Sequence, residues 1–159
     1  MAHSAGKVPA GCHTLTPHIV VRGAAEAIEF YKKAFRAREI RRMPGPDGQS
    51  IMFAEVQIGD SRLFLNDEAP QMGAISPATL KGTPVTIHMY TEDPDGVFQQ
   101  ATKAGAQVVM PLADMFWGDR YGVLADPYGH QWAIASHLRD VPPDELAQAA
   151  AAAFGGAKH

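Results

Sequence analysis

Residues 85–137 read VTIHMYTEDPDGVFQQATKAGAQVVMPLADMFWGDRYGVLADPYGHQWAIASH, and this stretch decides the fold. It opens with a run typical of a strand, Val85–Tyr90. Asp93 and Pro94 then supply a helix N-cap and a proline at the first helical position, and Gly105 ends that helix. Three strand-like runs follow, at Gln107–Met110, Tyr121–Ala125 and Gln131–Ala135. The predicted order of elements is therefore βαβββ.

The N-terminal part of the chain predicts the same order. A strand at Leu15–Val21 precedes a helix at Ala24–Phe35, whose apolar stripe consists of Ile28, Tyr31 and Phe35. Beyond the turn signal at residues 44–48, two strands are expected, Ser50–Ile58 and Arg62–Asn66, joined at Gly59-Asp60. A shift of about seventy residues places Thr16 on Thr86 and His18 on His88. We interpret the chain as an α+β protein built from two tandem βαβββ modules.

These patterns divide the chain into an arm, one domain and a tail. The arm covers residues 1–14, and the domain covers residues 15–140. Within the domain we expect a first module at about 15–68, a linker at about 69–84 that is rich in Gly, Pro, Ala and Ser, and a second module at about 85–137. Within residues 141–159, the alanine run is expected to form a C-terminal helix, and the last residues are expected to fray.

Composition argues against several classes of protein. The net charge of −3 gives no electrostatic basis for binding nucleic acid, and the basic residues Arg36, Arg38, Arg41 and Arg42 are expected to form a solvated face. Cys12 is the only cysteine, so neither an intrachain disulfide nor a cysteine-based zinc site is expected. Residues 1–10 lack the apolar core of a signal peptide, and no run approaches the ~20 apolar residues of a membrane span. We therefore expect a cytoplasmic protein that contacts no membrane.

Three stretches carry a resemblance to a known family: Ala27–Lys32 (AIEFYK), Met110–Tyr121 (MPLADMFWGDRY) and Asp126–His137 (DPYGHQWAIASH). Together with the duplicated module they resemble the glyoxalase/bleomycin resistance protein/extradiol dioxygenase superfamily, also called the vicinal oxygen chelate fold, and its PhnB-like branch in particular. The resemblance covers roughly residues 15–140. It implies that each module curls into a cupped half-barrel, that the halves form a partly open β-barrel around a small-molecule cavity, and that a homodimer completes it.

The resemblance also allows a test for the metal that enzymes of this family hold. Their ligands come from the first and last strand of each module, at positions that correspond here to Thr16, Thr86, Ala133 and a residue near Phe64. None of these is a His, Glu or Gln ligand. The sequence therefore predicts no metal and no cofactor.

A two-residue offset would change that result, because residues i and i+2 of a strand share a face. His18 and His88 would then be ligands, although the last strands offer no carboxylate and the direction of Glu55 is open. The alternative is thus a metal-dependent lyase, isomerase or dioxygenase that uses His18 and His88. The two histidines could equally line a metal-free pocket or satisfy hydrogen bonds inside the fold.

We select eight candidate ligand-binding residues: His18, Phe64, Asn66, His88, Tyr90, Trp117, Arg120 and Tyr121. We assign no catalytic residue. Within FWGDRY, the functional hypothesis is a loop that closes over an amphipathic or anionic ligand, with Arg120 as an anion-binding fork. In the structural alternative, Asp119 and Arg120 pair with each other in a turn while the aromatic residues pack a dimer interface. Trp132 and Ile134 are expected to face the helix, and Ala133 and Ala135 the cavity.

The interpretation that fits these observations is a metal-free, sequestering protein of the resistance type, which binds a small molecule as a homodimer. The metal-dependent enzyme is the first alternative. A third possibility is a metal-free enzyme that uses His18 or His88 for acid–base chemistry, with Arg120 holding a carboxylate or phosphonate.

Overall fold

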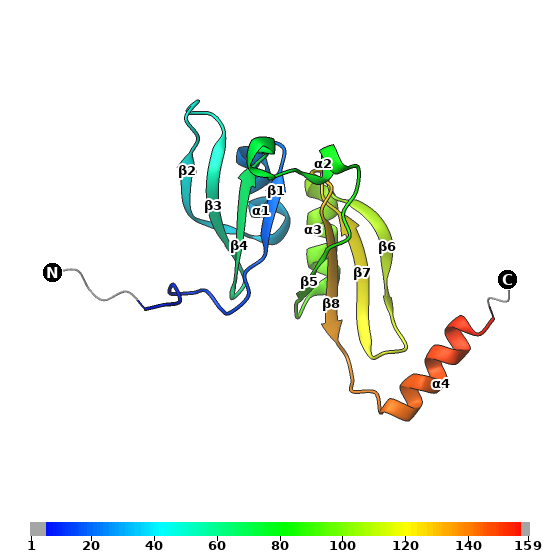
Figure 1. The fold of residues 1–159 in the computed structure, drawn as a ribbon. Helices are drawn as coiled ribbons and strands as arrows, with labels where there is room; N and C mark the ends of the chain where they lie inside the picture. The colour runs from blue at the N-terminus through cyan, green and yellow to red at the C-terminus, as the bar shows by residue number, and fades with distance from the viewer. Residues whose placement is uncertain (1–5, 157–159) are drawn as a thin grey trace.

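Two βαβββ modules with the same strand order follow one another along the chain (Figure 1). The structure is a computed structural model that describes residues 6–156, so residues 1–5 of the expected arm and 157–159 of the expected tail lie outside the described residues. The sheets have the orders β1-β4-β3-β2 and β5-β8-β7-β6. The first strand of each module is parallel to the last, and the other pairs are antiparallel. The predicted duplication and α+β class are confirmed.

The two modules contain these helices and strands. The first module consists of β1 (His18–Val21), α1 (Ala24–Phe35), β2 (Arg38–Pro44), β3 (Ile51–Ile58) and β4 (Ser61–Asp67). The second consists of β5 (Thr86–Tyr90), α3 (Pro94–Ala104), β6 (Gln107–Asp114), β7 (Asp119–Ala125) and β8 (Gln131–His137). Neither sheet closes on itself, so the chain described here forms two open sheets and not a closed barrel.

The core lies between the sheets and the helices. The predicted stripe of α1 is buried: Ile28 and Tyr31 have no exposed surface, and Phe35 is 7% exposed. From the second module, Trp132 and Ile134 join the same core, as their predicted direction toward the helix requires. The helices α1 and α3 also pack on each other, so the two modules share one continuous core.

A buried carboxylate joins the modules at this core. Asp126, at the turn before β8, accepts hydrogen bonds from the Tyr31 hydroxyl (2.6 Å) and from Trp132 Nε1 (2.9 Å). It also accepts from the backbone N–H groups of Tyr128 and His130, each at 2.9 Å. Burial, and then the charge of Asp126, raise the pKa of Tyr31 well above its usual range, so this hydroxyl stays a donor. Tyr31 and Asp126 lie in two of the stretches that carry the family resemblance, and their contact joins the two modules.

The structure differs from the sequence prediction in two connecting segments. The basic residues Arg38, Arg41 and Arg42 are exposed as expected, but they lie on a strand that the sequence did not predict. This strand, β2, is an edge strand paired with β3 through two irregular steps of register. The expected linker contains a short 3-10 helix η1 (Pro70–Met72) and one turn of helix α2 (Pro77–Leu80). Glu68 holds this segment, because its carboxylate accepts from Ser76 N–H (2.9 Å) and Ser76 Oγ (2.6 Å).

The C-terminal helix α4 (Pro143–Phe154) forms as the alanine run predicts, and it extends away from the second sheet (Figure 1). None of its residues is fully buried. The ring of Phe154 approaches that of Phe116, with 6.0 Å between centroids. Over residues 6–156, no helix is long and apolar enough to cross a membrane.

Candidate functional site

Each sheet has one face against its helix and one face turned away from it, which we call the open face. Strand pairing shows which residues share that face. His18 lies opposite Phe64, and His88 lies opposite Ala133. The neighbours of Phe64 and Ala133 along their strands, Leu65 and Ile134, are in the core. Because side chains alternate along a strand, both histidines point to the open faces, as predicted.

The open face of the first module carries a small aromatic group. The ring of His18 lies 6.0 Å from that of Phe64 and 6.2 Å from that of Phe53, between centroids and at steep angles. Nε2 of His18 is 2.6 Å from Oδ1 of Asn66, so this imidazole nitrogen already has a hydrogen-bond partner. Three of the eight candidate residues, His18, Phe64 and Asn66, are therefore brought together, and Phe53 joins them.

Glu55, whose direction the sequence left open, belongs to this same face. It pairs with Phe64 across β3 and β4, and it is 5% exposed. Its carboxylate accepts a hydrogen bond from Arg41 Nε at 2.9 Å and lies 3.6 Å from Arg62 Nε. Two guanidinium groups thus surround the carboxylate that would have to serve as a metal ligand.

The donor set on the open faces does not fit the metal that the resemblance implies. The positions opposite the two histidines are Phe64 and Ala133, which offer no donor atom. Glu55 stands two strands away from His18, roughly 10 Å between Cα atoms, and is bound by arginine. No group of three or more His, Cys, Asp or Glu side chains within residues 6–156 is placed to hold a metal ion.

The open face of the second module carries a row of rings that we call the aromatic strip: Tyr90, His88, Tyr121 and Trp117. Successive ring centroids are 4.7 Å apart (Tyr90 to His88), 5.8 Å (His88 to Tyr121) and 5.4 Å (Tyr121 to Trp117). Tyr90 remains 63% exposed. Ala133 and Ala135, which pair with His88 and Tyr90, are fully buried beside the row. The planes of successive rings are tilted by 42°, 38° and 75°, so the large rings form a stepped aromatic surface over small residues.

A buried carboxylate lies at one end of the aromatic strip. Asp119 is 6% exposed, and it accepts a hydrogen bond from the Tyr90 hydroxyl at 3.1 Å. Its other oxygen is 2.7 Å from Nδ1 of His137, whose Nε2 is 2.8 Å from Asp140. The hydrogen bonds to Asp119 and then Asp140 raise the pKa of His137 above its usual value. The bond to Asp119 likewise raises the pKa of Tyr90, so both groups favour their protonated forms.

Only residues 116–118 of FWGDRY form a turn, and Asp119 and Arg120 do not pair with each other as the structural alternative expected. The turn ends at Gly118, and Asp119 and Arg120 begin β7. Asp119 therefore faces the open side, while Arg120 points to the helix side. There Arg120 donates to Asp95 through Nε (2.9 Å) and Nη2 (2.7 Å), and to Asp114 at 3.0 Å. Of the eight candidates, Arg120 is the one that the structure places apart from the others.

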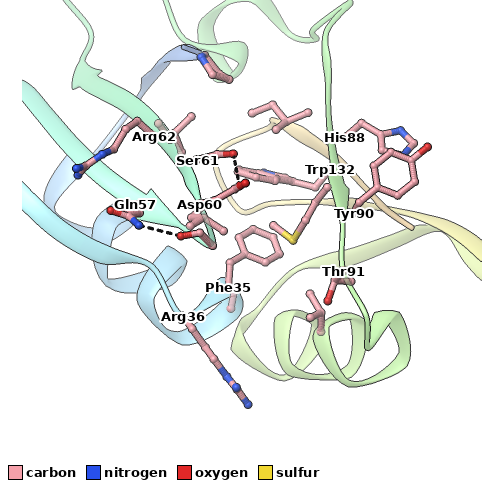
Figure 2. A pocket seen from close by; sticks show the side chains of 18 of the residues that line it. Phe35, Arg36, Gln57, Asp60, Ser61, Arg62, His88, Tyr90, Thr91 and Trp132 are labelled. Atoms are coloured by element: carbon pink, nitrogen blue, oxygen red, sulfur yellow. Dashed lines mark hydrogen bonds between the residues drawn. The ribbon is translucent and has the colours of Figure 1, made fainter. Parts of the chain in front are cut away.

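A groove of about 1070 Å³ lies between the modules (Figure 2). Its floor includes Phe35 and Trp132, whose ring centroids are 4.5 Å apart. The tip of the β3–β4 hairpin, with Asp60, forms one side, and β5 forms the other. Of the eight candidates only His88 and Tyr90 line it, and in Figure 2 both project away from the floor. The groove therefore meets the aromatic strip at β5.

Sequence reasoning missed Phe53 and His137 as members of these surfaces. His137 was recoverable in principle, because strand alternation places it with Ala135. Phe53 shares a face with Glu55, whose direction the sequence itself left open. Sequence reasoning placed Asp119 within the FWGDRY loop, or paired it with Arg120 in a turn. The opposite directions of Asp119 and Arg120 become visible only once the first residue of β7 is known.

Comparison with known proteins places these features in a family. The sequence model of the Glyoxalase/Bleomycin resistance protein/Dioxygenase superfamily matches residues 12–134. The uncharacterized protein Mb0911c of Mycobacterium bovis is 50% identical over 144 residues, which are 89% of this chain and 93% of that protein.

Solved structures agree at the level of the fold. TioX from Micromonospora sp. ML1 superposes with a TM-score of 0.64 at 24% identity, over 79% of this chain and 99% of that one. The PhnB protein from Bacillus cereus superposes with a TM-score of 0.57 at 20% identity, over 78% of this chain and 99% of that one. With the family model covering most of the domain, the chain belongs to the Glyoxalase/Bleomycin resistance protein/Dioxygenase superfamily.

Proposed function

We propose that this chain is a metal-free small-molecule-binding protein of the sequestering, resistance type, and that it acts as a homodimer. The aromatic strip on the open face of the second module carries this proposal. Rings that pack the interior of a protein are covered, whereas Tyr90 stands 63% exposed at one end of the row. An uncovered aromatic surface of this kind favours binding of an apolar or aromatic molecule.

The donor chemistry supports a site without metal. The residues opposite His18 and His88 have no donor atoms, and the nearest carboxylate on the first face is bound by Arg41. Catalysis by a metal with open coordination positions normally needs three protein ligands. The metal-dependent alternative would have to obtain the third ligand from elsewhere.

Exposed apolar residues support the homodimer. On the edge strands, Val109 of β6 is 54% exposed, Met110 of β6 is 42% exposed, and Met43 of β2 is 52% exposed. The helix α4 adds Phe154 at 71% exposure. Apolar surface concentrated on sheet edges and on an outlying helix is typical of an interface. We expect light scattering after gel filtration at micromolar concentration to give twice the chain mass of 17.1 kDa, and a monomeric mass would contradict the dimer.

Two finer assignments belong to the same proposal. We infer membership of the PhnB-like branch from FWGDRY and DPYGH in their places, and the fold of the Bacillus cereus PhnB protein is compatible with it. The cytoplasmic location stays a prediction of the sequence.

A screen of amphipathic aromatic compounds by thermal shift tests the function. We expect some compounds to raise the melting temperature of the wild-type protein and of Met72→Ala, a control at an exposed linker residue. The same compounds should fail with Tyr121→Ala, because this change opens a gap in the middle of the aromatic strip. Compounds that stabilise Tyr121→Ala equally well would contradict the proposed site.

A further inference from the structure

The charge on the open face of the second module indicates what kind of molecule the aromatic strip prefers. Its strands β5 to β8 contain a single Lys or Arg, namely Arg120. That guanidinium lies on the helix side, bound to Asp95 and Asp114. The open face of these strands therefore carries no guanidinium or ammonium group.

The same face does carry a fixed negative charge. Asp119 sits next to the ring of Tyr90 and is held in place by the Tyr90 hydroxyl and by His137. His137 also meets Asp140, so one imidazole stands between two carboxylates. The neighbouring Arg139 is paired with Glu145 at 2.8 Å. Even with the imidazole protonated, two positive groups therefore stand against three carboxylates, and the net charge is negative. An anionic ligand would meet repulsion here, contrary to the expectation that Arg120 would hold it.

Ring faces add to this preference. The face of an aromatic ring is the negative end of its quadrupole, and it attracts a cation placed over it. In the aromatic strip, four rings follow one another with 4.7 to 5.8 Å between successive centroids. The carboxylate of Asp119 lies at the Tyr90 end of this row. A cationic group on a flat apolar molecule would find both attractive surfaces at once.

We propose that the aromatic strip binds an organic cation, an aromatic molecule whose protonated or alkylated nitrogen lies beside Asp119 while its ring system packs on Tyr90, His88 and Tyr121. This rests on the proposed function, since it names the ligand class of the same site. The first module provides the contrast. There the buried carboxylate, Glu55, is already neutralised by Arg41 and Arg62, so that face offers an incoming cation no free negative charge.

The test compares three probes that differ mainly in charge: 3-hydroxyphenyltrimethylammonium, 3-tert-butylphenol and 3-hydroxybenzoate. Binding is followed by NMR through the indole N–H signals of the two tryptophans. Trp117 belongs to the aromatic strip, whereas Trp132 is buried and donates to Asp126, so its signal is an internal control. We expect the ammonium probe to shift the Trp117 signal with about tenfold higher affinity than its neutral analogue, and the carboxylate to bind weakest.

Two variants separate charge from shape. Asp119→Asn removes the charge while keeping the side-chain size and one acceptor oxygen, so one of the two bonds to Tyr90 and His137 is retained. It should bring the ammonium probe to the affinity of the neutral one. Asp95→Asn removes a carboxylate on the helix side, and it should leave the preference for the ammonium probe unchanged. An unshifted Trp132 signal verifies that each variant is folded. If Asp119→Asn perturbs the Trp132 signal, Tyr121→Leu is used in place of Asp119→Asn. The ammonium probe should then lose more affinity than the neutral probe.

The outcomes distinguish the two proposals. Equal binding of the ammonium and neutral probes to the wild-type protein, or tightest binding of the carboxylate, would overturn the cation preference and leave small-molecule binding at the strip supported. If no probe shifts Trp117, and the broader screen also finds no ligand that depends on Tyr121, both proposals are wrong.

Discussion

The two modules share one topology but bury their apolar residues very differently. In α1, seven of the twelve residues are buried, including Ile28 and Tyr31. In α3, only Pro94 and Ala101 of the eleven residues are buried. The strands follow the same trend, since β3 is largely buried while β6 is almost wholly exposed. The first module supplies most of the core, and the second leaves more of its apolar residues exposed.

The open faces differ in the same way in their charges. Each has a buried carboxylate, Glu55 in the first module and Asp119 in the second. Glu55 is paired with two arginines, whereas Asp119 is paired with a tyrosine and a histidine. Strand order was retained after the duplication while side-chain chemistry diverged, and this divergence separates the half that supplies most of the core from the half that we propose binds a ligand.

The largest effect is expected from breaking the junction between the halves. Asp126→Ala leaves the Tyr31 hydroxyl, the Trp132 indole N–H and two backbone N–H groups without their buried acceptor. Because each unsatisfied buried donor costs about 1–3 kcal/mol, the free energy of unfolding should fall by at least about 3 kcal/mol. Urea denaturation measures this.

The matched control is Asp60→Ala at the exposed hairpin tip, which should change the free energy of unfolding by less than about 0.5 kcal/mol. Similar losses for the two variants would show that the carboxylate of Asp126 does not hold the modules together.

A smaller effect is expected in the turn that leads into β7. Gly118 has φ of +97°, and a Cβ there would come within 2.2 Å of the Arg139 carbonyl oxygen. Gly118→Ala should therefore lower the free energy of unfolding by about 2 kcal/mol and displace Trp117.

Gly48→Ala is the control, because Gly48 also has a positive φ but a Cβ added at Gly48 would have no atom within 4 Å. It should cost only about 1 kcal/mol. Equal costs would mean that the turn can move away from Arg139.

The smallest effect concerns pH and the charge of the second open face. Asp119 and then Asp140 raise the pKa of His137 above 6.5, so protonated His137 stabilises the folded state. A raised folded-state pKa means that this contribution is complete below about pH 6.5 and is lost as pH rises through the folded-state pKa. An NMR titration of His137 should show the elevated pKa, and Asp119→Asn should lower it toward 6.5 while Asp95→Asn leaves it unchanged. An identical titration in Asp119→Asn would contradict the role of Asp119.

Local patterns in the sequence predicted the helix of the first module and one of its turns. The stripe Ile28, Tyr31 and Phe35 predicted α1 with the bounds that the structure has. The Gly59-Asp60 turn also lies where predicted, between β3 and β4. These features depend only on near neighbours, which is why a single sequence reveals them. The start of β1 was less accurate, since the strand begins at His18 after Pro17 and not at Leu15.

Features that depend on distant partners were harder to predict. The strand β2 is rich in arginine and looks like a solvated surface, yet pairing with β3 makes it an edge strand. Arg120 looked like a ligand-binding group because its partner Asp95, on α3, is 25 residues away. The structure brings seven of the eight candidate residues together in two sets, one on each open face. Arg120 is the exception, because side chains alternate along β7 and that of Arg120 points to the helix side.

Metal content tests the central claim, a binding site without a metal, most directly. The protein would be purified without chelators, analysed for bound elements, and melted with EDTA and with Zn²⁺, Ni²⁺, Mn²⁺ and Fe²⁺. We predict no stoichiometric metal and no change in melting temperature, for the wild-type protein and for His18→Ala and His88→Ala alike. A stoichiometric metal that disappears in either histidine variant would contradict the account and make the metal-dependent enzyme the better interpretation.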